Sequence, residues 1–95
     1  LCPETRDFEM LMIQADAYIG EGLFELSMES LRKCSHIRGL NTEQRVMLTL
    51  AIGQTMKGLG ESNKKIIDYL KRRTRIVGTD ERLTKMIKTL EETEE

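Results

Sequence analysis

The chain has 95 residues, a net charge of −1, 39% hydrophobic residues and 33% charged residues. This length fits one domain or a part of one, and the balanced charge gives no general attraction to nucleic acids or membrane surfaces. No apolar run approaches the roughly 20 residues needed to span a bilayer, and no signal-peptide pattern is present. We therefore expect a cytoplasmic protein without a membrane partner.

Residues 1–6 are expected to end a preceding element, because Leu1-Cys2-Pro3 is a common way to leave a helix. A first helix is predicted from about Asp7 to Gly20, where apolar residues recur at helical spacing. Gly20-Glu21-Gly22 then ends it, since glycine tolerates the left-handed conformation of a helix stop. The inward residues of this helix are Phe8, Leu11, Met12, Ala15, Tyr18 and Ile19.

A second helix is predicted over about Leu23 to Ile37, followed by Gly39. A third extends from Thr42 to about Lys57. Asn41 before it can accept a hydrogen bond from a free amide of the first turn, and Gln44 is placed to complete a capping box. The second helix turns inward Leu23, Leu26, Ser27, Ser30, Leu31 and Cys34, and the third carries Val46, Leu48, Leu50, Ile52, Gly53 and Met56.

A fourth helix is predicted from Ser62 or Asn63 to about Ile76, after the turn Gly58-Leu59-Gly60. Gly78-Thr79-Asp80 separates it from a fifth, capping helix, and the acidic residues 91–95 are expected to fray. The inward residues are Ile66, Ile67, Leu70 and Ile76 in the fourth helix and Leu83, Met86, Ile87 and Leu90 in the fifth. No strand pattern competes and the connections are short, which predicts an all-α fold of about five helices with antiparallel neighbours.

The chain repeats itself once, at a spacing of 38 residues. Ala15-Asp16-Ala17-Tyr18 aligns with Gly53-Gln54-Thr55-Met56, and Gly22 aligns with Gly60. Each copy reads as helix, glycine-bearing turn, helix, which divides the chain into repeat one (7–40), repeat two (41–78) and a capping helix (79–90). Periods of about 20–50 residues are typical of arrays whose units stack side by side, and such arrays bind other proteins along extended surfaces.

Small and large residues of the repeat fall where the tetratricopeptide family has them, and the chain resembles that family over about residues 8–79. The matching positions in the first unit are Ala15, Tyr18, Gly22, Phe24, Ser27, Leu31 and Cys34. The second unit departs from the pattern, since Lys65 and Arg72 stand where small residues belong. A shift of one residue would return Ile66 to the interior. The resemblance implies antiparallel helical hairpins stacked as a superhelix; another helical-hairpin repeat and an unrelated bundle are the alternatives.

In that family the first helix of each unit lines a concave wall that holds a peptide or helix of a partner protein. The resemblance therefore implies a partner-binding surface made of Glu9, Met12, Asp16, Ile19, Leu50, Gln54 and Lys57. Its mixture of apolar and polar groups suits a peptide in a groove. We expect a protein or peptide partner; a structural role in a longer solenoid, or self-association, is the alternative.

The most basic stretch covers residues 64–75, in which Asp68 is the only acid. At about 3.6 residues per turn, four of its basic residues share one helix face: Lys64, Lys71, Arg72 and Arg75. Such a patch can bind an acidic peptide, RNA or a phosphate-bearing ligand, or it is a solvated helix surface. The scarcity of aromatic residues, on which bases stack, argues against nucleic acid.

Catalytic and metal-binding patterns are missing. His36 is the only histidine and has no ligand cluster at suitable spacing, so a favourable interaction with the helix dipole is expected. Residues 56–60 resemble the calcium loop of annexins, but Glu61-Ser62 replaces the expected Thr-Asp, and the turn alone cannot supply six to eight oxygens. We predict a non-enzymatic chain without cofactor or metal, in which Cys2 and Cys34 are reduced packing thiols.

Overall fold

The computed structural model describes residues 3–93, and its side chains are described from residue 6. Five α-helices and no strand occur in this range, which confirms the predicted all-α fold. The helices are α1 (Pro3–Gly20), α2 (Phe24–Ser35), α3 (Thr42–Gly58), α4 (Asn63–Val77) and α5 (Glu81–Glu92).

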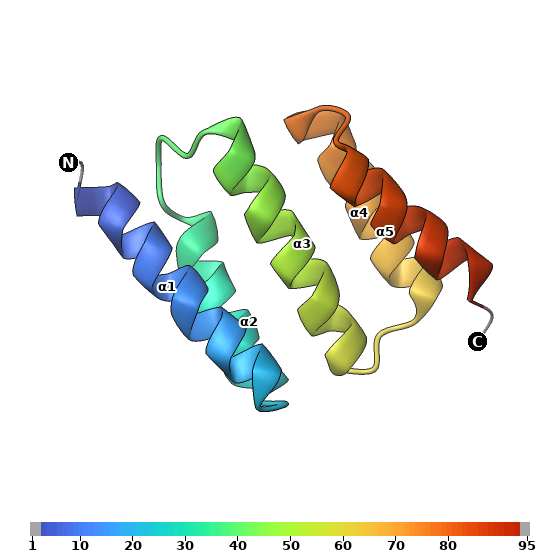
Figure 1. Ribbon diagram of the computed structural model, residues 1–95, viewed down its shortest axis with the longest axis horizontal. Coiled ribbons are helices and arrows are strands. Elements are labelled where there is room, and N and C mark those ends of the chain that lie inside the picture. Colours follow the sequence, from blue (N-terminus) through green and yellow to red (C-terminus); the bar gives the residue numbers. More distant parts are fainter. Residues whose placement is uncertain (1–2, 94–95) are drawn as a thin grey trace.

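The helices form two layers of stacked antiparallel hairpins. α1, α3 and α5 lie side by side in one layer, and α2 and α4 lie behind them (Figure 1). α3 is central because it packs against all four other helices, whereas the described backbones of α2 and α4 do not approach one another closely. The molecule measures 43 × 30 × 17 Å along its principal axes, so both layers have one surface open to solvent.

Side-chain caps fix where α3 and α4 begin. The Asn41 Oδ1 accepts the amide of Gln44 at 2.8 Å, and the Asn41 amide donates to Gln44 Oε1 at 2.9 Å, which is the predicted capping box. At the start of α4, Ser62 Oγ accepts the amide of Lys65 at 3.2 Å. These bonds satisfy amides that have no partner within the helix, so both starts are specified locally by the sequence.

The two ends of the chain differ from the sequence prediction. α1 begins at Pro3, so residues 3–6 are its first turn and not the end of a preceding element, while Leu1 and Cys2 lie outside the described residues. Proline fits a first helical position because the amide that it lacks would have no partner there. α5 continues to Glu92, so residues 91 and 92 are helical and not frayed, and residues 94–95 lie outside the described part.

The turns and first helices of the two hairpins are equivalent, as the repeat predicted. Gly22 and Gly60 have φ angles of 77° and 86°, a left-handed conformation that glycine adopts without a steric penalty. Ala15 is fully buried in α1, and its counterpart Gly53 is buried in α3. A Cβ atom on Gly53 would lie 3.0 Å from Cε of Met86 and 3.4 Å from Cδ2 of Leu70, so side chains of α4 and α5 pack closely on this position of α3.

In the second helices, equivalent positions are 39 residues apart in the sequence and not 38. The fully buried Ser27 and Leu31 of α2 correspond to the fully buried Ile66 and Leu70 of α4. The additional residue lies in the turn before α4, which begins after its cap, Ser62. The one-residue shift that would return Ile66 to the interior is thereby confirmed.

Three residues that were predicted to face inward are exposed. Leu23 is 43% exposed because it precedes α2 and is not part of the helical row. Leu26 is 44% exposed because the buried row of α2 passes through its neighbour Ser27. Ile76 is 62% exposed because the adjacent Val77 packs against the core in its place.

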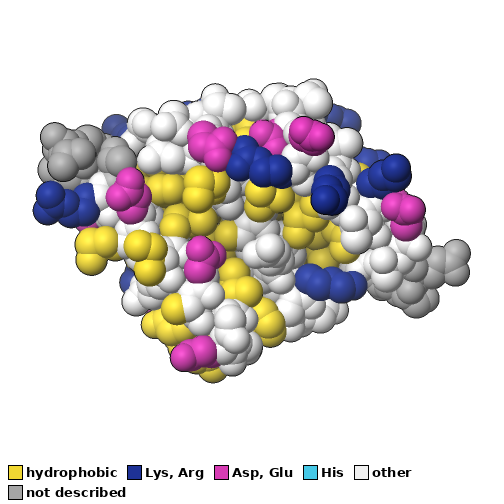
Figure 2. Space-filling view, in the orientation of Figure 1, with side chains coloured by type: hydrophobic (Ala, Val, Ile, Leu, Met, Phe, Trp, Pro, Cys, Tyr) yellow, Lys and Arg dark blue, Asp and Glu magenta, His cyan; other side chains and the backbone are white. Residues whose placement is uncertain are grey.

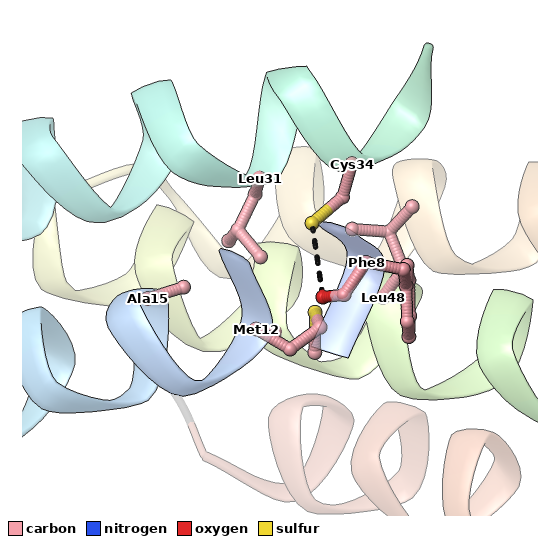
Figure 3. Close-up of a cluster of buried hydrophobic side chains, with 7 residues drawn as sticks. Phe8, Met12, Ala15, Leu31, Cys34 and Leu48 are labelled. Carbon is pink, nitrogen blue, oxygen red and sulfur yellow. Dashed lines mark hydrogen bonds between the residues drawn. The ribbon is translucent and has the colours of Figure 1, made fainter. Parts of the chain in front are cut away.

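The core consists of two clusters, one among α1, α2 and α3 and one among α3, α4 and α5, and Ile52 of α3 packs against both. In the first cluster Cys34 is a free, fully buried thiol whose Sγ lies 4.0 Å from the backbone oxygen of Phe8 (Figure 3). Burial raises the pKa of this thiol to about 11, so Cys34 is a packing residue, as predicted. The first cluster contains Phe8, Met12, Ala15, Leu31, Cys34, Leu48 and Ala51, and the second contains Val46, Met56, Ile66, Leu70, Leu83 and Leu90.

Candidate functional site

The predicted partner-binding residues lie on α1 and α3, which are neighbours in one layer (Figure 1). Figure 2 shows that layer from outside, with patches of hydrophobic side chains separated by acidic and basic ones. All but one of the predicted residues are at least partly accessible: Glu9, Asp16, Gln54 and Lys57 are exposed, and Ile19 and Leu50 are half-buried. The surface is therefore chemically mixed, as expected for peptide recognition.

Met12 is the exception and corrects the prediction. Its side chain is only 7% exposed and packs in the first core cluster with Phe8 and Ala15 (Figure 3). The reason is its spacing, because Met12 lies four residues after Phe8 and three before Ala15, on the same inward side of α1. Met12 stabilises the hairpin and is not available to a partner.

The most regular part of the surface is a row along α3. Its members follow at intervals of four and three residues and so lie on one side of the helix: Glu43, Met47, Leu50, Gln54 and Lys57. We call them the α3 row. Met47, which is 41% exposed, was not predicted as a site residue. Its spacing, three residues before Leu50, was the signal that could have identified it.

A parallel set of exposed residues occurs on α1. Ile13 lies four residues after Glu9 and three before Asp16, and it is 69% exposed. The nearby Met10 is 63% exposed. Neither was predicted as a site residue, although their exposure follows from the same helical periodicity that buries Phe8. Apolar groups beside carboxylates are thus accessible on α1 as well as on α3.

The first end of the α3 row is fixed by an ion-pair cluster that joins α3 to α5. The Arg82 guanidinium donates to both carboxylate oxygens of Glu43, at 2.7 and 2.8 Å. It also donates to Asp80 Oδ1 at 3.1 Å. Hydrogen bonds from Arg82 lower the pKa of both carboxyl groups, so Glu43 stays ionised but is already paired.

The other end of the row is also engaged. Lys57 Nζ donates to Asn63 Oδ1 at 2.6 Å. Asn63 Nδ2 in turn donates to the backbone oxygens of Leu90 at 3.2 Å and Thr93 at 2.8 Å. The charge of Lys57 therefore helps to hold the end of α5 near the start of α4, which reduces what Lys57 can offer to a partner.

The four basic residues predicted to share a face of α4 are all exposed: Lys64, Lys71, Arg72 and Arg75. A shallow groove of about 450 Å³ is lined by three of them, Lys71, Arg72 and Arg75, together with Lys65 and Asp68. Lys71 pairs with Glu91 of α5 at 3.4 Å. Within the described side chains, Arg72 and Arg75 make no ion pair, so part of the patch is available to anions.

No family model, no curated protein and no solved structure matches the chain. Within residues 3–93, no helix is long and apolar enough to cross a membrane. No three or more His, Cys, Asp or Glu side chains in the same range are grouped so that they could hold a metal ion. What the chain binds must therefore be inferred from its own surfaces.

Proposed function

We propose that the chain is a non-enzymatic protein-binding module, similar to tetratricopeptide repeats, that holds a peptide or helix of a partner across α1 and α3. The observation that supports this proposal is the α3 row, in which the exposed Met47 and the half-buried Leu50 lie between polar residues. Apolar anchors at helical intervals with polar groups around them suit a bound helix or peptide. Met47 is also flexible enough to adapt to different side chains.

The charges beside the α3 row favour a partner segment that carries basic residues. Glu43 and Lys57 are already paired within the chain, whereas Glu9 and Asp16 of α1 are exposed and form no ion pair with another described side chain. Acidic groups at the rim of an apolar contact attract a basic segment and repel a carboxylate. Asp16 is therefore the residue whose charge should matter most for partner choice.

The proposal can be tested by selecting peptides from a random helical library on the immobilised chain and measuring their affinities. Asp16→Lys is expected to weaken selected peptides by about tenfold, because an exposed attraction becomes a repulsion. Glu29→Lys is the matched control: it makes the same charge change at an exposed position on α2, in the other layer. It should change affinity by less than about twofold.

Amide chemical shifts of the chain should locate the peptide independently of affinity. Changes concentrated at the α3 row and around Asp16 would support the proposal. Equal weakening by Asp16→Lys and Glu29→Lys, or shift changes confined to α2 and α4, would contradict it.

We also propose that the protein works in a reducing compartment, as the cytoplasm is. Cys34 is a free thiol inside the first core cluster, and cysteines in oxidising compartments are commonly paired. Localisation of the tagged full-length protein tests this part of the proposal, and secretion would contradict it.

Two alternatives are favoured by particular surfaces. The α4 patch favours binding of RNA or another phosphate-bearing ligand, and its affinity would fall steeply with salt, whereas a largely apolar peptide contact would change little. The exposed Met10 and Ile13 on the outer side of α1 favour self-association or packing in a longer array. Sedimentation over a range of concentrations separates a self-associating chain from a monomer.

A further inference from the structure

A cavity of about 590 Å³ lies on the side of α3 that faces away from the α3 row. It exists because α2 and α4 both pack on α3 but their backbones do not approach one another closely, which leaves a groove between them with α3 as its floor. Its volume is in the range of small-ligand sites, roughly 300–1,000 Å³. It is lined by Ser35, Ile37, Arg38, Gly39, Leu40, Arg45, Leu48, Thr49, Ile52, Tyr69 and Arg73.

The charge of this cavity is entirely positive. Three arginines from three different segments line it: Arg38 from the loop after α2, Arg45 from α3 and Arg73 from α4. No aspartate or glutamate lines it. None of the three arginines forms an ion pair with any described side chain. Three positive charges therefore line one cavity without a carboxylate to offset them, so an anion bound there would be attracted by all three.

Arg73 provides an independent observation. Its Nε is buried and has no hydrogen-bond acceptor among the described residues. A buried donor without a partner is rare and costly, and more so on a charged group. Arg73 therefore has hydrogen-bonding capacity that the protein does not use, and a small movement of its side chain would direct that capacity to a bound anion.

The remaining lining divides into a neutral polar part and an apolar floor. Burial raises the pKa of the Tyr69 hydroxyl, more than the nearby Arg73 and Thr49 lower it, so Tyr69 stays protonated at neutral pH and can donate a hydrogen bond. Leu48 and Ile52 of α3 form the apolar floor. A ligand that suits this cavity has an anionic head and a less polar body.

We infer that this cavity binds a phosphate monoester, with Arg38, Arg45 and Arg73 around the phosphate and the organic part against Leu48 and Ile52. A phosphate monoester has nearly two negative charges and three acceptor oxygens at neutral pH. Guanidinium groups match these oxygens with paired hydrogen bonds. This site goes beyond the proposed protein-binding surface, because it opens between α2 and α4 in the opposite layer. Its arginines are seven and 28 residues apart in the sequence and share no helix face, so only the fold brings them together.

The test is an amide chemical-shift titration of the full chain in chloride buffer with three probes: glycerol 3-phosphate, a short peptide with one phosphoserine, and the same peptide without phosphate. Both phosphate-bearing probes should shift the amides of Gly39, Thr49 and Arg73, and the unmodified peptide should not. Tighter binding of the phosphopeptide would identify a modified protein as the source of the phosphate. Tighter binding of glycerol 3-phosphate would identify a small molecule.

Substitutions distinguish this cavity from the general basic character of α4. Arg73→Gln and Arg45→Gln should each weaken phosphate binding by about tenfold or more, as expected for the loss of a charge-assisted hydrogen bond. Arg72→Gln is the matched control, because it removes the same charge from the next residue of α4, outside the cavity. It should weaken binding by less than about twofold.

Spectra of the free variants report folding, and Arg73→Lys retains the charge if Arg73→Gln does not fold. Equal weakening by Arg72→Gln and Arg73→Gln would overturn the inference. Absence of shifts at millimolar phosphate, or equal binding of the unmodified peptide, would also overturn it.

Discussion

The two hairpins are alike in the turn and at the centre of the second helix. They differ one helical turn later in that second helix. Both have a left-handed glycine in the turn, Gly22 or Gly60, and both bury a leucine at the centre of the second helix, Leu31 or Leu70. One helical turn after Leu31, Cys34 is fully buried in the first core cluster. The equivalent residue in α4 is Arg73, which lines a cavity instead.

This difference shows which parts of a duplicated unit are free to change. Turn glycines and central leucines determine whether the hairpin closes, since they act through backbone conformation and close packing. The position one turn after the central leucine is less restricted, because Cys34 is part of the core there in the first hairpin and Arg73 lines a cavity in the second. A basic cavity can therefore occur in one unit while its neighbour retains a closed apolar core.

The largest expected effect tests whether the two hairpins are equally well packed. Leu31→Ala and Leu70→Ala each remove a fully buried side chain and should each lower the free energy of unfolding by about 2–5 kcal/mol. Urea denaturation of both variants gives the comparison. A loss below about 1 kcal/mol for either variant would show that its hairpin is not packed as described.

An intermediate effect should have opposite signs in the two hairpins. Gly20 and Gly58 are the last residues of α1 and α3, but a Cβ on Gly58 would overlap the ring of Phe24, whereas a Cβ on Gly20 would meet nothing within 4 Å. Gly58→Ala should destabilise the fold by about 1–3 kcal/mol through overpacking. Gly20→Ala should be neutral or stabilising by up to about 1 kcal/mol. Thermal melting of both variants decides the signs, and a stabilising Gly58→Ala would refute the contact with Phe24.

The smallest effect concerns Cys34, the residue that Arg73 replaces in the second hairpin. Because burial raises its pKa from 9.0 to about 11, the folded state holds the thiol proton more tightly than the unfolded state. This contribution is fully present below pH 9 and is lost as the pH rises toward 11.

Between pH 8 and 10, the wild-type chain should therefore lose about 1 kcal/mol more stability than Cys34→Ala. Denaturant titrations of both proteins at each pH measure this difference. Lysines and tyrosines titrate in the same range, but they are the same in both proteins, so their effect cancels in the comparison. Parallel curves would show that the thiol is accessible to water.

Local signals predicted the helices well, because glycine stops and the Asn41–Gln44 capping box act over a few residues. Two predictions for Met12 disagreed: helical periodicity placed it inward, whereas the family resemblance placed it on the partner-binding surface. Periodicity was correct. The meeting of Arg38, Arg45 and Arg73 depends on how α2 and α4 are spaced on α3, which no local pattern reports. The partner and ligand proposals remain predictions.

The fastening of α5 at both ends has a consequence for motion. Arg82 in its first turn donates to Glu43 of α3. Asn63 accepts a hydrogen bond from Lys57 and donates to the backbone oxygens of Leu90, in the last turn, and of Thr93, directly after the helix. A terminal helix held only by its apolar side exchanges its amide hydrogens progressively faster toward its free end. α5 should instead open as a whole, with similar exchange rates along its length, and replacing the single side chain of Asn63 by alanine should restore the gradient.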